Sequence, residues 1–230
     1  RPNKTAWRYD FELPLSVGRV EYSIGEFEGT FHVPAAHESP RMAYASCNGF
    51  SDPKLMKQVQ DKNERWAHMA RQHARQPYHL LLLGGDQVYS DDMWKTVREL
   101  EQWTDLSLND RLKAKFTVAL RKQLDGYFAD LYLKRWSQPE PHAMLQSIPT
   151  IMMWDDHDIM DGWGSYPCDL HACDVYQGVF SVAQSYFRLF QQQCAADEPH
   201  ACAIPGQSAF SLGFSGLGDV ALLVPDLRSE

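Results

Sequence analysis

Three short runs of apolar residues, each ending abruptly in a polar loop, constrain the fold of this chain more than any other feature. They lie at residues 41–46, 78–83 and 148–154 and read RMAYAS, YHLLLL and IPTIMMW. Short apolar strands separated by helical segments are typical of a sheet that helices cover. The sequence therefore predicts an α/β domain. In such a domain, polar residues at the carboxyl ends of the strands converge on one site.

Helices and hairpins are expected around these strands. Asp52 and Pro53 are suited to begin a helix, which we expect to run to about residue 74. Apolar side chains at four-residue spacing predict a long helix from about residue 109 to about residue 135. Further helices are expected over residues 93–103 and 174–193, and hairpins over residues 17–34 and 208–230.

The change of pattern after the first hairpin indicates two units. Apolar and polar residues alternate in residues 17–34, which is typical of a hairpin or of the last strands of a β-domain. The segment from Pro34 to Pro40 resembles a linker. We expect residues 1–38 to be the end of an N-terminal β-domain with its linker, and residues 39–230 to be the α/β domain.

The polar loops gather acidic residues where a folded core gains nothing from them. Asp86 follows two glycines, and the segment WDDHD at residues 154–158 holds three carboxylates and an imidazole. Unpaired carboxylates in a partly desolvated site are costly, and a divalent or trivalent cation removes that cost. Asp and His ligands suit Zn, Fe, Mn or Ca, and the addition of Cys47 or Tyr89 favours iron. Two such ions hold a phosphate and generate the hydroxide that attacks it.

Four segments in order, YASCNGF, GGDQVYSD, WDDHDIMDGWGS and DLRSE, resemble the motifs of the PhoD-like (alkaline phosphatase D) metallophosphatases. The resemblance spans residues 41–230. It implies a calcineurin-like four-layer sandwich, in which two mixed sheets are flanked by helices and preceded by a small β segment. It also implies hydrolysis of phosphate mono- or diesters by a metal-activated hydroxide.

The same resemblance implies a role for each candidate site residue. Cys47 and Tyr89 would bind Fe(3+), and Asp86 would bridge this iron to a second metal such as Ca(2+), with Zn or Mn as alternatives. The second metal would be bound by Asp156. The remaining implied roles are His157 as general acid or phosphate contact, Asp158 as the residue that orients His157, Arg228 as phosphate contact, and Asn48 as a substrate-binding residue.

Two features depart from the family pattern. Pro225 interrupts the last apolar run, although a central strand needs the backbone donor that proline lacks. The later His-containing loops that complete the metal site in the family have no counterpart, because GDV at residues 218–220 is followed by no His. We therefore expect a catalytic domain that is truncated at its C-terminal end, or a chain that does not assemble the whole site by itself.

Charge and hydropathy limit the classes of substrate and partner that this chain is expected to bind. The formal net charge is −8 and no basic stripe is present, which argues against nucleic acid as the substrate. No apolar run approaches the roughly 20 residues of a membrane helix. A small phosphate ester is the expected substrate; a non-catalytic binding module or pseudoenzyme, and a nuclease on the same scaffold, are the alternatives. Neither the oligomeric state nor the compartment, cytoplasmic or periplasmic and secreted, can be read from the residues.

The cysteines leave two possibilities open. Five cysteines leave one unpaired in any disulfide scheme. Four of them are either plain thiols or form one or two disulfides: Cys168, Cys173, Cys194 and Cys202. The spacing of Cys168, His171 and Cys173 superficially resembles a zinc site, but it lacks the paired spacing of structural zinc ligands.

Overall fold

The structure is a computed structural model, and it describes residues 5–13, 18–35, 38–50, 52–195, 198–206, 209–214 and 220–229. Residues 36–37 of the expected linker and residue 230 of the last motif lie outside the described residues. The expected division of the chain at residue 38 stays a prediction.

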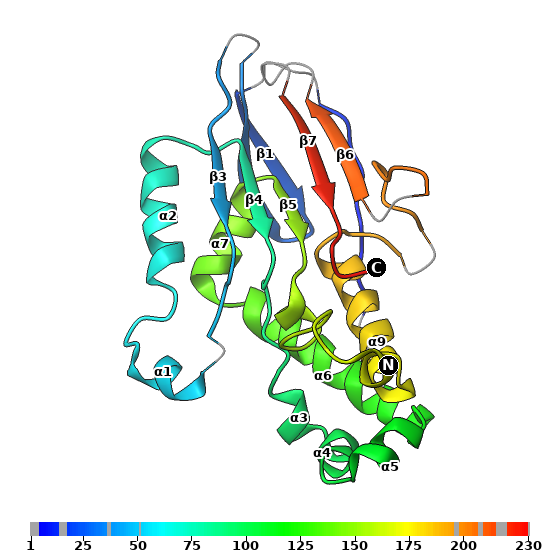
Figure 1. The fold of residues 1–230 in the computed structure, drawn as a ribbon. Helices are drawn as coiled ribbons and strands as arrows, with labels where there is room; N and C mark the ends of the chain where they lie inside the picture. The colour runs from blue at the N-terminus through cyan, green and yellow to red at the C-terminus, as the bar shows by residue number, and fades with distance from the viewer. Residues whose placement is uncertain are drawn as a thin grey trace.

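A parallel sheet forms the centre of the molecule, as the three apolar runs predict (Figure 1). Its strands, in spatial order, are β3 (Met42–Ala45), β4 (Leu80–Gly84) and β5 (Thr150–Met153). Ala45 lies opposite Leu83, and Gly84 lies opposite Met153. The three strands therefore end almost level, and the loops that follow them lie at one edge of the sheet.

Two antiparallel hairpins flank this sheet, and both were expected from the sequence. The first consists of β1 (Gly18–Ile24) and β2 (Phe27–Val33), and the second of β6 (Ala209–Phe214) and β7 (Val220–Pro225). Pro225 is the last residue of β7 and lies opposite Ala209. Proline is tolerated there because a strand end need not continue the ladder of hydrogen bonds.

The helix expected over residues 53–74 is divided in two. Asp52 caps α1 (Pro53–Gln58) by accepting a hydrogen bond from the Lys54 N–H, as expected, but Val59 is extended and ends that helix. A second helix, α2, runs over Glu64–Arg75. Between them the Asp61 carboxylate accepts a hydrogen bond from the backbone of Asn63 (3.0 Å), which favours a turn over a continuous helix.

The long helix expected over residues 109–135 is also divided, into α5 (Leu108–Lys113) and α6 (Val118–Trp136). Thr117 starts α6 by accepting a hydrogen bond from the Leu120 N–H (2.9 Å). Phe116 continues the apolar spacing, but its ring lies against Gly178 of another helix, where a Cβ atom would come within 2.1 Å. Tertiary packing, rather than helical periodicity, therefore explains the apolar side chain at this position.

The remaining helices are short except for one. The expected helix over residues 93–103 consists of α3 (Met93–Thr96) and α4 (Arg98–Thr104), and α9 (Asp174–Phe190) agrees with the expectation. Two helices were not expected, α7 (Pro139–Ser147) and α8 (Cys168–His171). Residues Asp156–Asp158 form a 3-10 turn, η1. In the described part of the chain, no helix is long and apolar enough to cross a membrane.

Helices cover one face of the central sheet. Trp66 of α2 and Met144 of α7 pack with Leu81 and Leu83 of β4. On the opposite face Tyr44 of β3 is 69% exposed, and a groove runs between the sheet and the apolar residues of β7. Figure 1 shows the β6–β7 hairpin beside β5, although it belongs to a separate sheet. The structure confirms a mixed α/β fold with parallel and antiparallel sheets, and the four-layer sandwich stays a prediction.

A buried histidine ties the start of β4 to the residue before β3. The ring Nδ1 of His79 accepts a hydrogen bond from the Arg41 backbone N–H (2.9 Å), which requires that this nitrogen carry no proton. Its Nε2 lies 3.2 Å from the Arg41 guanidinium and 3.9 Å from the Glu38 carboxylate. Burial and the charges of Arg41 and His32 lower the pKa of His79 below its ordinary value of 6.5, against the opposing effect of Glu38.

Acid is therefore expected to destabilise the fold through His79. This histidine is neutral when folded and binds its proton more readily when unfolded. The contribution of neutral His79 to the free energy of unfolding is complete above the ordinary pKa of histidine. This contribution is lost as the pH falls below that value. Urea unfolding from about pH 8 to about pH 5 should show a falling free energy of unfolding, and His79→Gln should reduce that slope. His68→Gln, at an exposed site on α2, should keep the wild-type slope; the same slope in His79→Gln would contradict the prediction.

Candidate metal centre

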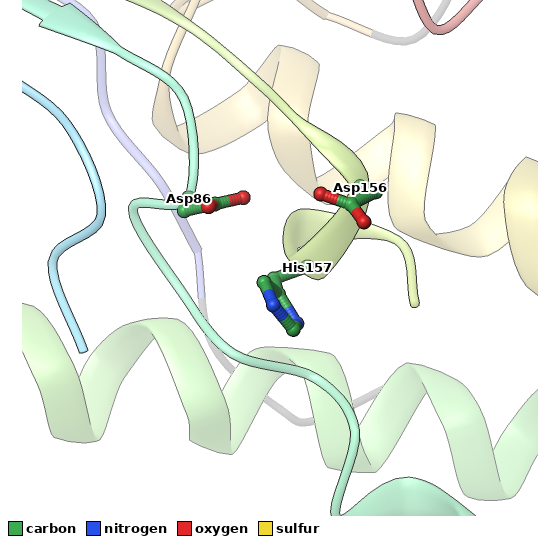
Figure 2. A group of neighbouring side chains, drawn as sticks. All are labelled: Asp86, Asp156 and His157. Carbon is green, nitrogen blue, oxygen red and sulfur yellow. The ribbon is translucent and has the colours of Figure 1, made fainter. Parts of the chain in front are cut away.

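Two carboxylates and an imidazole meet where β4 and β5 end. Ligand atoms of Asp86, Asp156 and His157 all lie within 4.8 Å of one another. Figure 2 shows the two carboxylates facing each other, with the His157 ring below them. Asp86 follows β4 and the other two residues belong to η1, which follows β5. The level strand ends therefore bring together residues that are 70 positions apart in the chain, as the sequence predicts.

Asp86 is held in a conformation that points to a bound cation. Its φ is 53°, a left-handed value that is costly for a residue other than glycine. The residue is only 6% exposed, and its Oδ1 atom is buried without a hydrogen-bond partner among the described residues. Burial raises the pKa of this carboxyl group. An orphaned buried oxygen beside a second carboxylate fits a metal ligand, because a cation supplies the missing partner.

Cys47 contacts Asp86, and Tyr89 lies next to this cluster, stacked on His157. The Cys47 thiol donates to Asp86 Oδ2 (3.4 Å) and lies within hydrogen-bonding reach of the Tyr89 hydroxyl. Cys47 also has a left-handed φ of 59°. Burial, and then the charge of Asp86, raise the pKa of Tyr89. Without a cation both groups therefore stay protonated, whereas a metal ion favours their anionic, ligating forms.

A carboxylate that follows β4 orients His157. The His157 Nδ1 atom lies 2.7 Å from Asp91 Oδ2, and the imidazole stacks on the Tyr89 ring with centroids 4.4 Å apart. Burial lowers the pKa of His157, but the hydrogen bond to Asp91 and the charges of Asp91, Asp86 and Asp156 outweigh it, so the net pKa is raised. This arrangement favours the protonated form of the imidazole at the edge of the centre.

No hydrogen bond joins Asp158 to His157 among the described residues, although the resemblance implies that Asp158 orients the imidazole. One Asp158 oxygen accepts hydrogen bonds from the Gln87 and Val88 N–H groups (3.1 Å each) and from the Gln191 side chain (2.9 Å). The other oxygen accepts one from the Asp155 N–H (2.9 Å). Burial raises the pKa of Asp158 to about 7. Asp158 thus connects the loop after β4 to the turn after β5, and the orienting role falls to Asp91.

Nothing in the sequence pattern assigns a role to Asp91 or Gln191. Asp91 stands two residues after Tyr89, and both side chains contact His157, while Ser90 between them anchors the loop. The Ser90 N–H donates to His157 O (3.0 Å), and the Ser90 hydroxyl donates to Ile159 O (2.7 Å). The cluster of acids after GGDQVY is the available signal for Asp91.

Arg228 lies beside the centre, near the position that the resemblance implies. Its guanidinium forms an ion pair with Asp155 and lies 3.8 Å from Asp156 Oδ1. Its backbone carbonyl accepts a hydrogen bond from the Trp163 indole (2.9 Å), which anchors the segment after β7 against the turn after β5. A cation is therefore placed next to the two carboxylates that follow β5.

The Asn48 side chain is engaged away from the carboxylates. Its Oδ1 accepts hydrogen bonds from the Trp66 indole (2.7 Å) and from the Arg135 guanidinium. Its amide nitrogen lies 3.4 Å from Gln87 O. These contacts support a structural role for Asn48, which is to hold the loop after β3 in place. They do not support the substrate contact that the resemblance implies.

The cysteine alternatives are resolved for the described residues. All five cysteines are free thiols. His171 packs on the Trp163 ring, with centroids 4.2 Å apart. Within the described part of the chain, Asp86, Asp156 and His157 are the only group of three or more with metal-binding geometry, so Cys168, His171 and Cys173 form no zinc site there.

Comparison with known proteins is consistent with this geometry. The family model of PhoD related phosphatases matches residues 4–227. An uncharacterized protein of Saccharomyces cerevisiae, YGR266W, is 30% identical over 217 residues, and the match covers 84% of this chain and 30% of the yeast protein. The chain thus spans less than a third of the length of that relative. No solved structure matches.

Proposed function

The chain belongs to the PhoD-related phosphatase family, and from this premise we propose that it forms part of a metal-dependent phosphoesterase that hydrolyses small phosphate mono- or diesters. The observation that supports this most is the buried, unpartnered Oδ1 of Asp86 beside Asp156 and His157. A fold gains no stability from this arrangement. A centre that binds a cation and a phosphate requires it.

Four residues would hold the metals: Cys47, Asp86, Tyr89 and Asp156. The thiol and the phenol suit Fe(3+), and the carboxylates suit Ca(2+) as the second ion, with Zn or Mn as alternatives. When bound, the metals polarise the phosphate and activate the attacking water. Cys47 and Tyr89 would contribute anionic sulfur and oxygen ligands, and Asp86 and Asp156 would contribute carboxylates.

The protein's own residues would handle the proton and the substrate. His157 donates a proton to the leaving oxygen, because Asp91 raises its pKa and fixes its ring. Arg228 contacts the phosphate from the side of Asp156, where its guanidinium already lies. Asp158 and Asn48 connect the loops after β3, β4 and β5 through their hydrogen bonds.

The open face of the central sheet supports the finer fold proposal. Parallel sheets are normally covered on both faces. Here Tyr44, Leu82, Ile151 and residues of β7 line an apolar groove on the face opposite α2 and α7. A second sheet of a calcineurin-like sandwich would cover this groove.

Metal content and diester hydrolysis test the proposal directly. Plasma mass spectrometry of the purified chain should find near-stoichiometric iron, with or without calcium, and the loaded chain should hydrolyse bis-p-nitrophenyl phosphate. A folded chain that binds metal but hydrolyses neither mono- nor diesters would contradict the proposal and favour a binding module. Faster cleavage of single-stranded DNA than of the small diester would favour a nuclease instead.

A further inference from the structure

Arg135, in the last turn of α6, joins three segments through one side chain. Its Nη2 donates to the Asn48 side-chain oxygen, and its Nη1 donates to Asn63 Oδ1 (2.8 Å) and Gln138 Oε1 (2.9 Å). Asn63 immediately precedes α2 and Gln138 immediately precedes α7. The guanidinium therefore connects the loop after β3 to the starts of two helices.

This network does not follow the usual pattern for a half-buried charge. All of the hydrogen-bond acceptors of Arg135 within the described residues are neutral amide oxygens, and its Nε is buried without a partner there. Glu140 is linked to the network through the Asn63 amide (3.0 Å). Even partial burial of a cation among neutral groups carries a desolvation cost, so stability alone is a poor explanation for this arginine. A requirement for position explains it better.

The segment that Arg135 reaches through Asn48 shapes one side of the metal centre. The Asn48 N–H donates to Asp86 O (2.7 Å), and the Cys47 N–H donates to Gly85 O (3.1 Å). On the other side of Asn48, Gly49 lies under the Tyr89 ring, where a Cβ atom would come within 2.3 Å. The left-handed φ of Cys47 persists only if its surroundings hold it in place.

We propose that Arg135 is a positioning residue that holds the Cys47–Gly49 segment, and with it the Cys47 and Tyr89 ligands, against Asp86. The planar guanidinium group of Arg135 holds the segment by donating hydrogen bonds to Asn48 from Nη2 and to Asn63 and Gln138 from Nη1. The single ammonium group of a lysine cannot reach both Asn48 and these other two residues. The catalytic meaning of this role rests on the proposed function, whereas the positioning itself does not.

Hydrogen exchange in the metal-free chain tests the positioning. In Arg135→Lys and in Arg135→Met, the backbone amide hydrogens of Cys47 and Asn48 should exchange at least about tenfold faster than in the wild type. The reason is that each variant loses a charge-assisted hydrogen bond that restrains the segment. Exchange of the β4 amides should not change. Arg121→Met removes an exposed arginine from the same helix, and this control should exchange like the wild type.

Two outcomes would overturn the proposal. One is a folded Arg135→Lys chain whose Cys47 and Asn48 amides exchange at the wild-type rate. The other is faster exchange spread equally over all elements, which would make Arg135 a general stabilising residue. Cobalt titration adds a second readout: Arg135→Lys should weaken metal binding about tenfold or more. If the wild-type chain binds no metal at all, this chain does not form the proposed metal centre by itself, while the exchange result still decides the role of Arg135.

Discussion

Replacing Asp86 with asparagine is expected to abolish metal binding and phosphoester hydrolysis while the chain stays folded. Asparagine keeps the size of the side chain but removes the charge that would bind both cations. Loss of a residue that only orients a metal ligand costs about tenfold to about a hundredfold, so loss of Asp86 should cost more than about a hundredfold in kcat/KM. Metal content and hydrolysis of a small diester measure this directly.

The same variant should be at least as stable as the wild type when both are free of metal. Asp86 is a buried carboxylate with an unpartnered oxygen, and the neutral amide carries a smaller desolvation cost. Urea unfolding in the presence of a chelator measures this difference. Asp92→Asn, at an exposed carboxylate of the same loop, is the matched control and should change neither activity nor stability. Full activity in Asp86→Asn would show that Asp86 does not bind the metals.

Replacing His157 with glutamine should slow hydrolysis by about a hundredfold to about ten-thousandfold, the usual contribution of a general acid. The imidazole is fixed by Asp91 and by stacking on Tyr89, and its raised pKa keeps the proton that the leaving oxygen requires. The loss should be large for an alkyl phosphate and small for a p-nitrophenyl ester, whose leaving group needs no proton. Kinetics with both substrates measure this difference.

Two further variants separate proton donation from metal binding. Asp91→Asn removes the carboxylate that raises the pKa of His157, so the alkaline fall of kcat/KM should move to lower pH. His68→Gln changes an exposed histidine on α2 and should leave both substrates unaffected. Equal losses on both substrates, together with loss of metal, would make His157 a metal ligand instead of an acid.

The helix boundaries show where pattern reading from the sequence stops. Leu112, Phe116, Leu120 and Leu124 have helical spacing, yet the chain leaves the helix at Ala114 and begins a new one after Thr117. The deciding contacts are distant: the Phe116 N–H donates to the Asp174 carboxylate (3.2 Å), and the ring lies on Gly178. The spacing of apolar residues along the sequence predicts that a side chain is buried. It does not indicate which helix or strand buries that side chain.

Much of the candidate centre was predictable, because level strand ends of one sheet must bring their loops together. On that basis the sequence predicts that Cys47, Asp86, Tyr89, Asp156 and His157 converge, and the structure places them together. The roles within the cluster were less predictable. Asp158 is adjacent to His157 in the chain, but successive side chains of the turn point in different directions, and the partner of His157 is Asp91.

The sequence by itself determined the α/β class, the three central strands and the residues that meet at their ends, because apolar runs and the polar loops that follow them are local features. Only the tertiary structure decided which carboxylate orients His157 and that Arg135 reaches Asn48. It also showed that Asp86 Oδ1 is left without a partner. Each of these depends on the directions of side chains from segments far apart in the chain, and spacing along the sequence carries no information about those directions.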